Sequence, residues 1–181
     1  MSIFQYCVDN ICFNIDAPLF YSIDVECVDN MYEYCIKRTE YDGVIAINDV
    51  EYSDIPMINS PISIVPKSLC LYPYMDVYKG VRLGLDIHQE PKDEIEHENC
   101  ILEYLHRIPK KLGFVQLRGV AMFRAFTRYP SIVIMDDIFD IVEDDDCITS
   151  LIQLIDKYSI PVLYLNRSHN KLVDKTSLSV I

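Results

Sequence analysis

The stretch "YPSIVIMDDIFDIVEDDDCITSLIQLIDKYSIPVLYLN", residues 129–166, decides the fold of this chain. Its first apolar run, residues 132–135, is rich in β-branched side chains and predicts a buried strand. The acidic start and apolar stripe of residues 146–158 predict a helix, and residues 161–165 predict a second strand. A strand, a helix and a strand with short connections form a parallel βαβ unit with a right-handed crossover. The sequence therefore predicts an α/β domain.

The first predicted strand ends on two carboxylates, Asp136 and Asp137. Ligands gather at the carboxyl ends of strands in parallel sheets, so these acids are candidates for catalysis or for a metal site. The alternative is a solvated strand end, which we favour because a short motif match alone has a high false-positive risk. The acids of residues 143–146 form either a cation cluster or a helix start stabilised by the helix dipole, and we favour the helix start.

Composition and charge limit the classes of protein to which the chain can belong. Its 181 residues suffice for one domain with a real core, and half of them are hydrophobic, which argues against global disorder. The formal net charge of −12 argues against a nucleic-acid partner and against charge-driven docking on anionic lipid. The N-terminus lacks the basic and apolar regions of a secretory signal, and no apolar run approaches the roughly 20 residues of a membrane span.

The cysteines and histidines show no metal-binding spacing. The seven cysteines are scattered and form no CxxC pair, so we expect neither a disulfide framework nor a zinc site. They are interpreted as mostly buried thiols in a reducing cytosol. The four histidines have no metal-like spacing either, and we expect surface or packing roles for them.

The rest of the chain contributes further predicted elements. Residues 1–65 are strand-rich, in "NICFNI", "FYSIDVEC" and "GVIAIND", whereas "DNMYEYCIKR" is compatible with a helix or a strand. Prolines divide the middle of the chain into loops. Residues 91–107 predict an amphipathic helix, and residues 115–128 predict a second helix that is apolar on most sides and therefore buried.

The segment "KKLGFVQLRGVAMFRAFTRYPSIVIMDDIFDIVEDDD" resembles the core of the ABC-transporter ATPases. That family has a signature LSGGQ, a helix ending in Arg-Ala, a proline, and a Walker B strand followed by Asp-Glu. In this sequence the signature falls on Leu112–Gln116, with Gly113 in place of its serine and Gln116 as its glutamine. Asp136 falls on the Walker B aspartate and Asp137 on the catalytic glutamate.

A second segment, "SIVPKSLCLYPYMDVYKGVRLGLDI", is similar to the Q-loop region of the sugar-importer type, and "DNICFNI" and "DGVIAINDVEYSDI" resemble the N-terminal strands of the family. The resemblance implies an α/β fold with a P-loop-NTPase-like (ABC-type) core. That fold would have a parallel sheet, an N-terminal antiparallel β portion and a shortened helical subdomain at residues 85–111. We expect one such domain over residues 1–181.

The departures from the family pattern concern nucleotide binding. The phosphate-binding motif GxxxxGK(S/T) is absent, and the first glycine of the sequence is Gly43. The corresponding stretch, "DVECVDNMYEYC", carries acids that would repel a triphosphate. The signature glycines are replaced by Phe114 and Val115. The Q-loop glutamine aligns with Lys67 and the switch histidine with Arg167, so these two residues are either an alternative anion site or surface charges.

Aromatic residues follow the Q-loop-like turn. Tyr72, Tyr74, Met75 and Tyr78 are either a core cluster or a contact patch, and clustered Tyr and Met suit an interface. In the family this segment lies near the groove that receives the coupling helix of the transporter. We therefore favour a contact role for it.

Three functions are compatible with these features. The favoured hypothesis is a catalytically degenerate ABC-type domain, a pseudo-ATPase, that partners a transmembrane permease or an active ABC ATPase subunit. It would lie in the cytoplasm against the inner face of the membrane, with homodimerisation as a further option. No cofactor is expected, Asp136 would at most hold a metal weakly, and no direct membrane insertion is expected. The alternatives are a working ATPase that binds Mg-ATP through atypical motifs, and a Mg²⁺-dependent phosphohydrolase built on Asp136 and Asp137.

Overall fold

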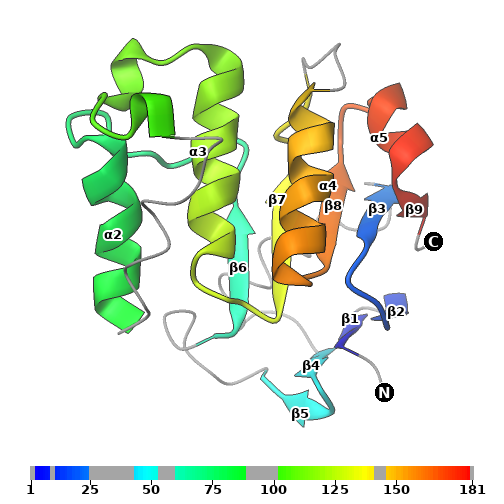
Figure 1. Cartoon of the computed structure of the whole chain (residues 1–181). Helices are drawn as coiled ribbons and strands as arrows, with labels where there is room; N and C mark the ends of the chain where they lie inside the picture. Colours follow the sequence, from blue (N-terminus) through cyan, green and yellow to red (C-terminus); the bar gives the residue numbers. More distant parts are fainter. Residues whose placement is uncertain are drawn as a thin grey trace.

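A computed structural model describes residues 3–8, 11–24, 43–52, 60–88, 102–140 and 146–179. Two sheets form its framework (Figure 1). The first is antiparallel, in the order β2-β1-β4-β5, and the second is parallel, in the order β6-β7-β8-β3-β9. The strands of the first sheet are β1 Phe4–Val8, β2 Ile11–Ile15, β4 Gly43–Ile47 and β5 Val50–Glu51. Those of the second are β6 Ile62–Val65, β7 Ile132–Asp136, β8 Val162–Asn166, β3 Phe20–Asp24 and β9 Leu178–Ser179.

The predicted βαβ unit is confirmed. Strands β7 and β8 pair in parallel, with Val133 opposite Val162, and the helix α4 Asp146–Tyr158 connects them. Cys147, Ile148, Leu151, Leu154 and Ile155 form the buried stripe of α4. The first four residues of β7 and all of β8 are buried, as expected for parallel strands covered on both faces.

The parallel sheet is buried on both faces, one against the antiparallel sheet and the other against helices. One face of that sheet packs on the side chains of Phe4, Phe13 and Ile15 from the antiparallel sheet. The other face packs under the helices α3 Phe114–Phe126 and α4, which lie side by side over it in Figure 1. The helix predicted for residues 115–128 is therefore confirmed and buried. The α5 helix, Lys171–Thr176, follows β8 and contacts β3.

The middle of the chain differs from the sequence-based expectation. A helix, α2 Val77–His88, forms where the residue pattern gave no element, and the carboxylate of Asp76 accepts a hydrogen bond from the Lys79 N–H at 2.8 Å, as an N-cap does. Of the helix predicted over residues 91–107, residues 91–101 lie outside the described part of the chain.

The described remainder, residues 102–107, is not α-helical, so the prediction is wrong there. It forms a 3₁₀ turn, η4 Leu102–Tyr104, and a second one, η5 Pro109–Lys111, follows it. The carbonyl groups of Leu105 and Arg107 accept hydrogen bonds from the N–H groups of Tyr78 and Val77 at the start of α2. These tertiary hydrogen bonds replace the helical ones.

The expectation for the cysteines is wrong in part. Cys7 and Cys12 lie on β1 and β2, are exposed and form a disulfide, while Cys70 is exposed and Cys147 is buried as a free thiol. The alternation of the hairpin explains this result, because Phe13 and Ile15 point into the core, whereas the side chain of Cys12 lies on the opposite, exposed face of β2. The remaining three cysteines, and the segment "DNMYEYCIKR", lie outside the described residues.

Candidate functional site

Two acids lie at the carboxyl end of β7: Asp136 is the last residue of the strand, and Asp137 is the first residue after it. The Asp137 side chain is 1% exposed, its φ is +49°, and its N–H donates to the Leu165 carbonyl at 3.1 Å. Asp136 is partly buried. The favoured interpretation of a solvated strand end is therefore wrong for Asp137, which is buried and hydrogen-bonded.

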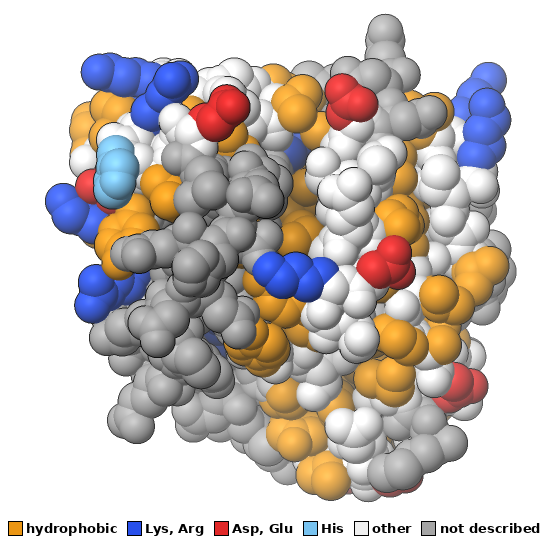
Figure 2. Space-filling model, viewed as in Figure 1, with side chains coloured by type: hydrophobic (Ala, Val, Ile, Leu, Met, Phe, Trp, Pro, Cys, Tyr) orange, Lys and Arg blue, Asp and Glu red, His pale blue; other side chains and the backbone are white. Residues whose placement is uncertain are grey.

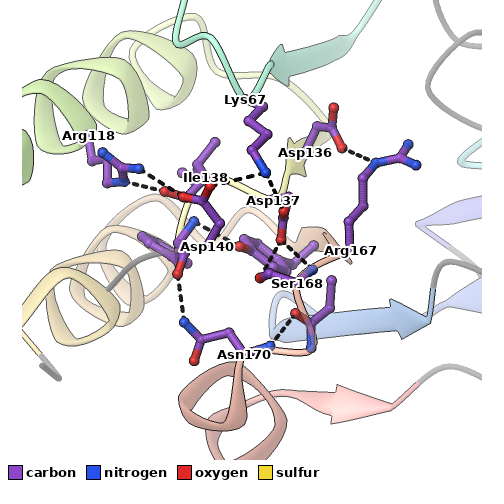
Figure 3. A network of polar contacts seen from close by, with 12 residues as sticks. Lys67, Arg118, Asp136, Asp137, Ile138, Asp140, Arg167, Ser168 and Asn170 are labelled. Atoms are coloured by element: carbon purple, nitrogen blue, oxygen red, sulfur yellow. Dashed lines mark hydrogen bonds and ion pairs between the residues drawn. The ribbon is translucent and has the colours of Figure 1, made fainter. Parts of the chain in front are cut away.

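Lys67 reaches the acids from the turn that follows β6. Its ammonium nitrogen lies 2.8 Å from Oδ2 of Asp137 and 3.1 Å from Oδ2 of Asp140 (Figure 3). These hydrogen bonds, the one to Asp137 above all, raise the pKa of Lys67. The Lys67 side chain is about half exposed, whereas its two partners are largely buried. Lys67 therefore covers the acids from the solvent side.

The turn after β8 supplies the other partners of Asp136 and Asp137. The Ser168 N–H and hydroxyl both donate to Oδ1 of Asp137, at 3.0 and 2.7 Å. Arg167 Nε donates to Oδ1 of Asp136 at 2.6 Å. The structure thus brings together Lys67, Asp136, Asp137 and Arg167, as the resemblance predicted, and it pairs the cations with the acids.

A buried arginine, Arg118, joins this network from α3. Its NH2 group lies 3.2 Å from Oδ1 of Asp140, its Nε donates to the Ile138 carbonyl, and its guanidinium lies over the Phe114 ring. Burial lowers the pKa of Arg118, and the charge of Asp140 opposes that effect. Arg118 and Asp140 were not among the predicted site residues, because no family motif aligns with either of them.

Neighbouring groups fix the loop that carries the acids. The Phe139 N–H donates to the Tyr164 hydroxyl at 2.8 Å, and the side-chain amide of Asn170 donates to the Phe139 carbonyl at 2.6 Å. Burial raises the pKa of Tyr164, so this phenol stays neutral at every physiological pH. The loop after β7 is thereby held on both sides by β8 and the residues that follow it.

The charged side chains of the site are paired with one another. Three carboxylates, those of Asp136, Asp137 and Asp140, are paired with three cations, those of Lys67, Arg118 and Arg167. Both oxygens of Asp137 already accept hydrogen bonds. Within the described residues no group of three or more His, Cys, Asp or Glu side chains is placed to hold a metal ion. These residues do not fit a Mg²⁺ ion, because cations already occupy the carboxylates that would have to bind it.

The other predicted positions near the signature-like segment have a structural role or lie outside the description. The side-chain amide oxygen of Gln116 accepts a hydrogen bond from the Gly113 N–H at 3.0 Å and so caps the start of α3. Residues 143–145 of the acidic run before α4 lie outside the described residues, as does most of the stretch that aligns with the phosphate-binding loop, residues 25–35.

The aromatic segment divides into exposed and packed residues. Tyr72 and Tyr74 are 50% and 80% exposed, Met75 is half-buried, and Tyr78 packs against the core and under Arg82. Tyr72 also borders a surface cavity of about 200 Å³ between β6, α2 and α3. The two exposed rings fit a contact patch, and Tyr78 fits a core role.

Arg124 holds the turn that carries this segment. Its two terminal nitrogens donate to the carbonyl groups of Cys70 and Leu69, at 2.8 and 2.9 Å. Leu69 and Cys70 both have positive φ values, 60° and 43°, a conformation that is uncommon for residues other than glycine. The Arg124 guanidinium thus stabilises the strained turn between Lys67 and Tyr72.

Part of the chain is similar in sequence to ATP-binding proteins of bacterial transporters. Over 107 residues it is 36% identical to the osmoprotective compounds uptake ATP-binding protein GgtA of Synechocystis, a match that covers 55% of the chain and 30% of that protein. Over 102 residues it is 35% identical to the oligosaccharides import ATP-binding protein MsmX of Bacillus subtilis, covering 52% and 28%. The chain thus spans less than a third of the length of these relatives. No protein-family model matches it.

Solved structures of ATP-binding subunits of ABC transporters superpose on most of this chain. The cbiO1 subunit of the Clostridium perfringens ABC transporter complex cbiONQ superposes with a TM-score of 0.74 at 17% identity, over 92% of this chain and 78% of that one. An ATP-binding subunit of another ABC transporter gives a TM-score of 0.74 at 16% identity, over 92% and 80%. The fold is that of the ABC ATPase domains, and the predicted class, a parallel sheet with an antiparallel β portion, is confirmed.

Proposed function

Because the relatives of this chain are ATP-binding subunits of ABC transporters, including sugar importers, we propose that it is an ABC-type domain that has lost catalysis and acts by binding a partner. The partner is a transmembrane permease or an active ABC ATPase subunit. The domain would then attach to the cytoplasmic face of the membrane through that partner. No described helix is long and apolar enough to cross a bilayer.

One observation carries the proposal, the neutralised state of the acid site. Catalysis of phosphoryl transfer depends on positioning the phosphates and on a metal that neutralises their charge. Here Lys67 covers Asp137 and Arg167 covers Asp136, at 2.8 and 2.6 Å, so the two acids are engaged within the protein. A Mg²⁺ ion held between the two carboxylates would have to compete with both cations.

The sequence supports the same conclusion. It contains no GxxxxGK(S/T) motif, whose backbone N–H groups and lysine would hold the phosphates. Phe114 and Val115, in place of the two signature glycines, are partly exposed bulky side chains at the start of α3. The phosphate-binding motif and the signature glycines are therefore both absent from the sequence, and with them the glycine backbone that approaches a phosphate closely.

The surface around Tyr72 and Tyr74 is the proposed contact with the permease. Exposed tyrosine rings are enriched at protein interfaces relative to the rest of a protein surface. The Lys110 ammonium lies 4.0 Å from the centre of the Tyr74 ring. Figure 2 shows Lys and Arg side chains gathered at the edge of the molecule near α2 and the turns before α3. The cations of α2 and of these turns are Lys79, Arg82, Arg107, Lys110 and Lys111.

Cross-linking in the host cell tests this proposal. Tyr74 would be replaced by a photo-reactive phenylalanine derivative, because its ring is the most exposed of the segment. After irradiation we expect a covalent adduct with a membrane-embedded protein, identified by mass spectrometry. Val50, 53% exposed on β5, provides the matched control position and should give no such adduct. Adducts at Tyr74 with soluble proteins alone, or identical adducts at both positions, would contradict the proposed contact.

A further inference from the structure

The β1–β2 hairpin carries a pair of sulfur atoms that the acid site and the contact surface do not use. Cys7 lies directly opposite Cys12 in the register of the hairpin, and their Cα atoms are 4.1 Å apart. That spacing matches the close pairs of an antiparallel ladder, in which the two residues do not exchange backbone hydrogen bonds and their side chains approach one another. The strand register therefore places the two sulfur atoms together.

We propose that Cys7 and Cys12 form a reversible dithiol–disulfide site that exchanges with low-molecular-weight thiols of the glutathione class. Both residues are exposed, so a dissolved thiolate can reach the sulfur atoms. Cys147, in contrast, lies on the buried face of α4. The proposal holds whether or not the chain binds ATP or a permease.

The hairpin keeps its register without the disulfide. The opposite face of the two strands buries Phe4, Tyr6, Phe13 and Ile15. Strand β1 is also paired along its length with β4, with Phe4 opposite Ile47. A disulfide across only five positions removes little entropy from the unfolded chain. Reduction therefore leaves two thiols facing one another and ready to close again.

The exchange balances with one molecule of oxidised glutathione. A Cys7 thiolate attacks the glutathione disulfide, so a Cys7–glutathione bond forms and one glutathione thiolate leaves. The Cys12 thiolate then attacks the Cys7 sulfur, the Cys7–Cys12 bond forms and the second glutathione thiolate leaves. Two electrons pass from the protein to glutathione, and the two protons released by the cysteines end on the two leaving thiolates.

A titration of the full chain with defined ratios of reduced to oxidised glutathione, at one fixed total glutathione concentration, tests the proposal. After acid quenching and alkylation, peptide mass spectrometry distinguishes a Cys7–Cys12 link from two alkylated thiols. We expect one reversible transition whose midpoint does not change with protein concentration, because the bond is intramolecular. The proposal is overturned if both thiols stay alkylated at every ratio, if the link persists at every ratio, or if either cysteine bonds to another cysteine.

Two variants sharpen this test. In Cys7→Ser, Cys12 has no opposite thiol, so a mixed disulfide with glutathione should accumulate on it. In the matched control Cys70→Ser, which removes an exposed thiol elsewhere, the Cys7–Cys12 transition should be unchanged. A shifted transition in Cys70→Ser, or an unmodified Cys12 in Cys7→Ser, would count against a self-contained site.

Discussion

Asp137→Ala should lower the free energy of unfolding by about 3 kcal/mol, the largest effect that we expect from a substitution in the acid site. The buried carboxylate accepts hydrogen bonds from Lys67 and from the N–H and hydroxyl of Ser168, and alanine accepts none. The φ of +49° at this position adds strain for alanine. For a domain of this size the melting temperature should fall by roughly 6–12 °C, measured by circular dichroism.

Two further variants separate the causes of that loss. Asp137→Asn keeps an oxygen acceptor and tolerates the positive φ, so it should lose about half as much stability. Lys67→Ala should lose less than about 1 kcal/mol, because the lysine is about half exposed and water replaces its contacts. If Asp137→Ala were no less stable than Asp137→Asn, the carboxylate would not be the acceptor that organises this loop.

Arg124→Met should destabilise the protein by about 2 kcal/mol, measured by urea denaturation. Methionine keeps the apolar part of the side chain but removes the donors to the Leu69 and Cys70 carbonyl groups. The strained turn should then open locally, so the Leu69 N–H, which donates to the Pro66 carbonyl, should exchange faster with deuterium.

The control for Arg124→Met is Lys110→Met, which removes an exposed cation of the neighbouring surface and should change stability by no more than about 0.5 kcal/mol. Equal destabilisation by the two substitutions would show that Arg124 acts as an ordinary surface charge. Unchanged exchange at Leu69 would show that the turn is stable without it.

The sequence predicted correctly those helices and strands in which an apolar run or an apolar stripe continues along the whole element. The run 132–135 and the stripe of α4 are buried from end to end, so hydrophobic periodicity alone places them in the βαβ unit. The residue pattern gave no element at α2, because only the loops at the prolines before it were assigned. Its N-cap, Asp76, is the signal that could have located its start, since the carboxylate binds the Lys79 N–H.

The candidate site was predictable only where a family motif aligns with it. Lys67, Asp136, Asp137 and Arg167 were placed together through their order in the sequence, and the structure brings them together. That Asp137 is buried, and that Asp140 pairs with Arg118 from α3, depends on how the loop after β7 turns back over the sheet. The Cys7–Cys12 pair likewise depends on strand register, which the spacing of the two cysteines alone does not fix.

The melting temperature of the chain with and without Mg-ATP tests the central claim, that this ABC-type domain has no working nucleotide site. A ligand present at 100 times its dissociation constant stabilises the native state by about 2.7 kcal/mol. For a domain of this size each kcal/mol corresponds to roughly 2–4 °C, so micromolar binding at millimolar nucleotide would raise the melting temperature by about 5 °C or more.

We expect no such shift with Mg-ATP, because the phosphate-binding motif is absent and the acids are paired with Lys67 and Arg167. The same measurement with Mg²⁺ alone, with ATP alone and on the Asp136→Asn variant provides the controls. A rise of several degrees that requires both Mg²⁺ and ATP and disappears in Asp136→Asn would contradict the account and show that the chain binds nucleotide at this site.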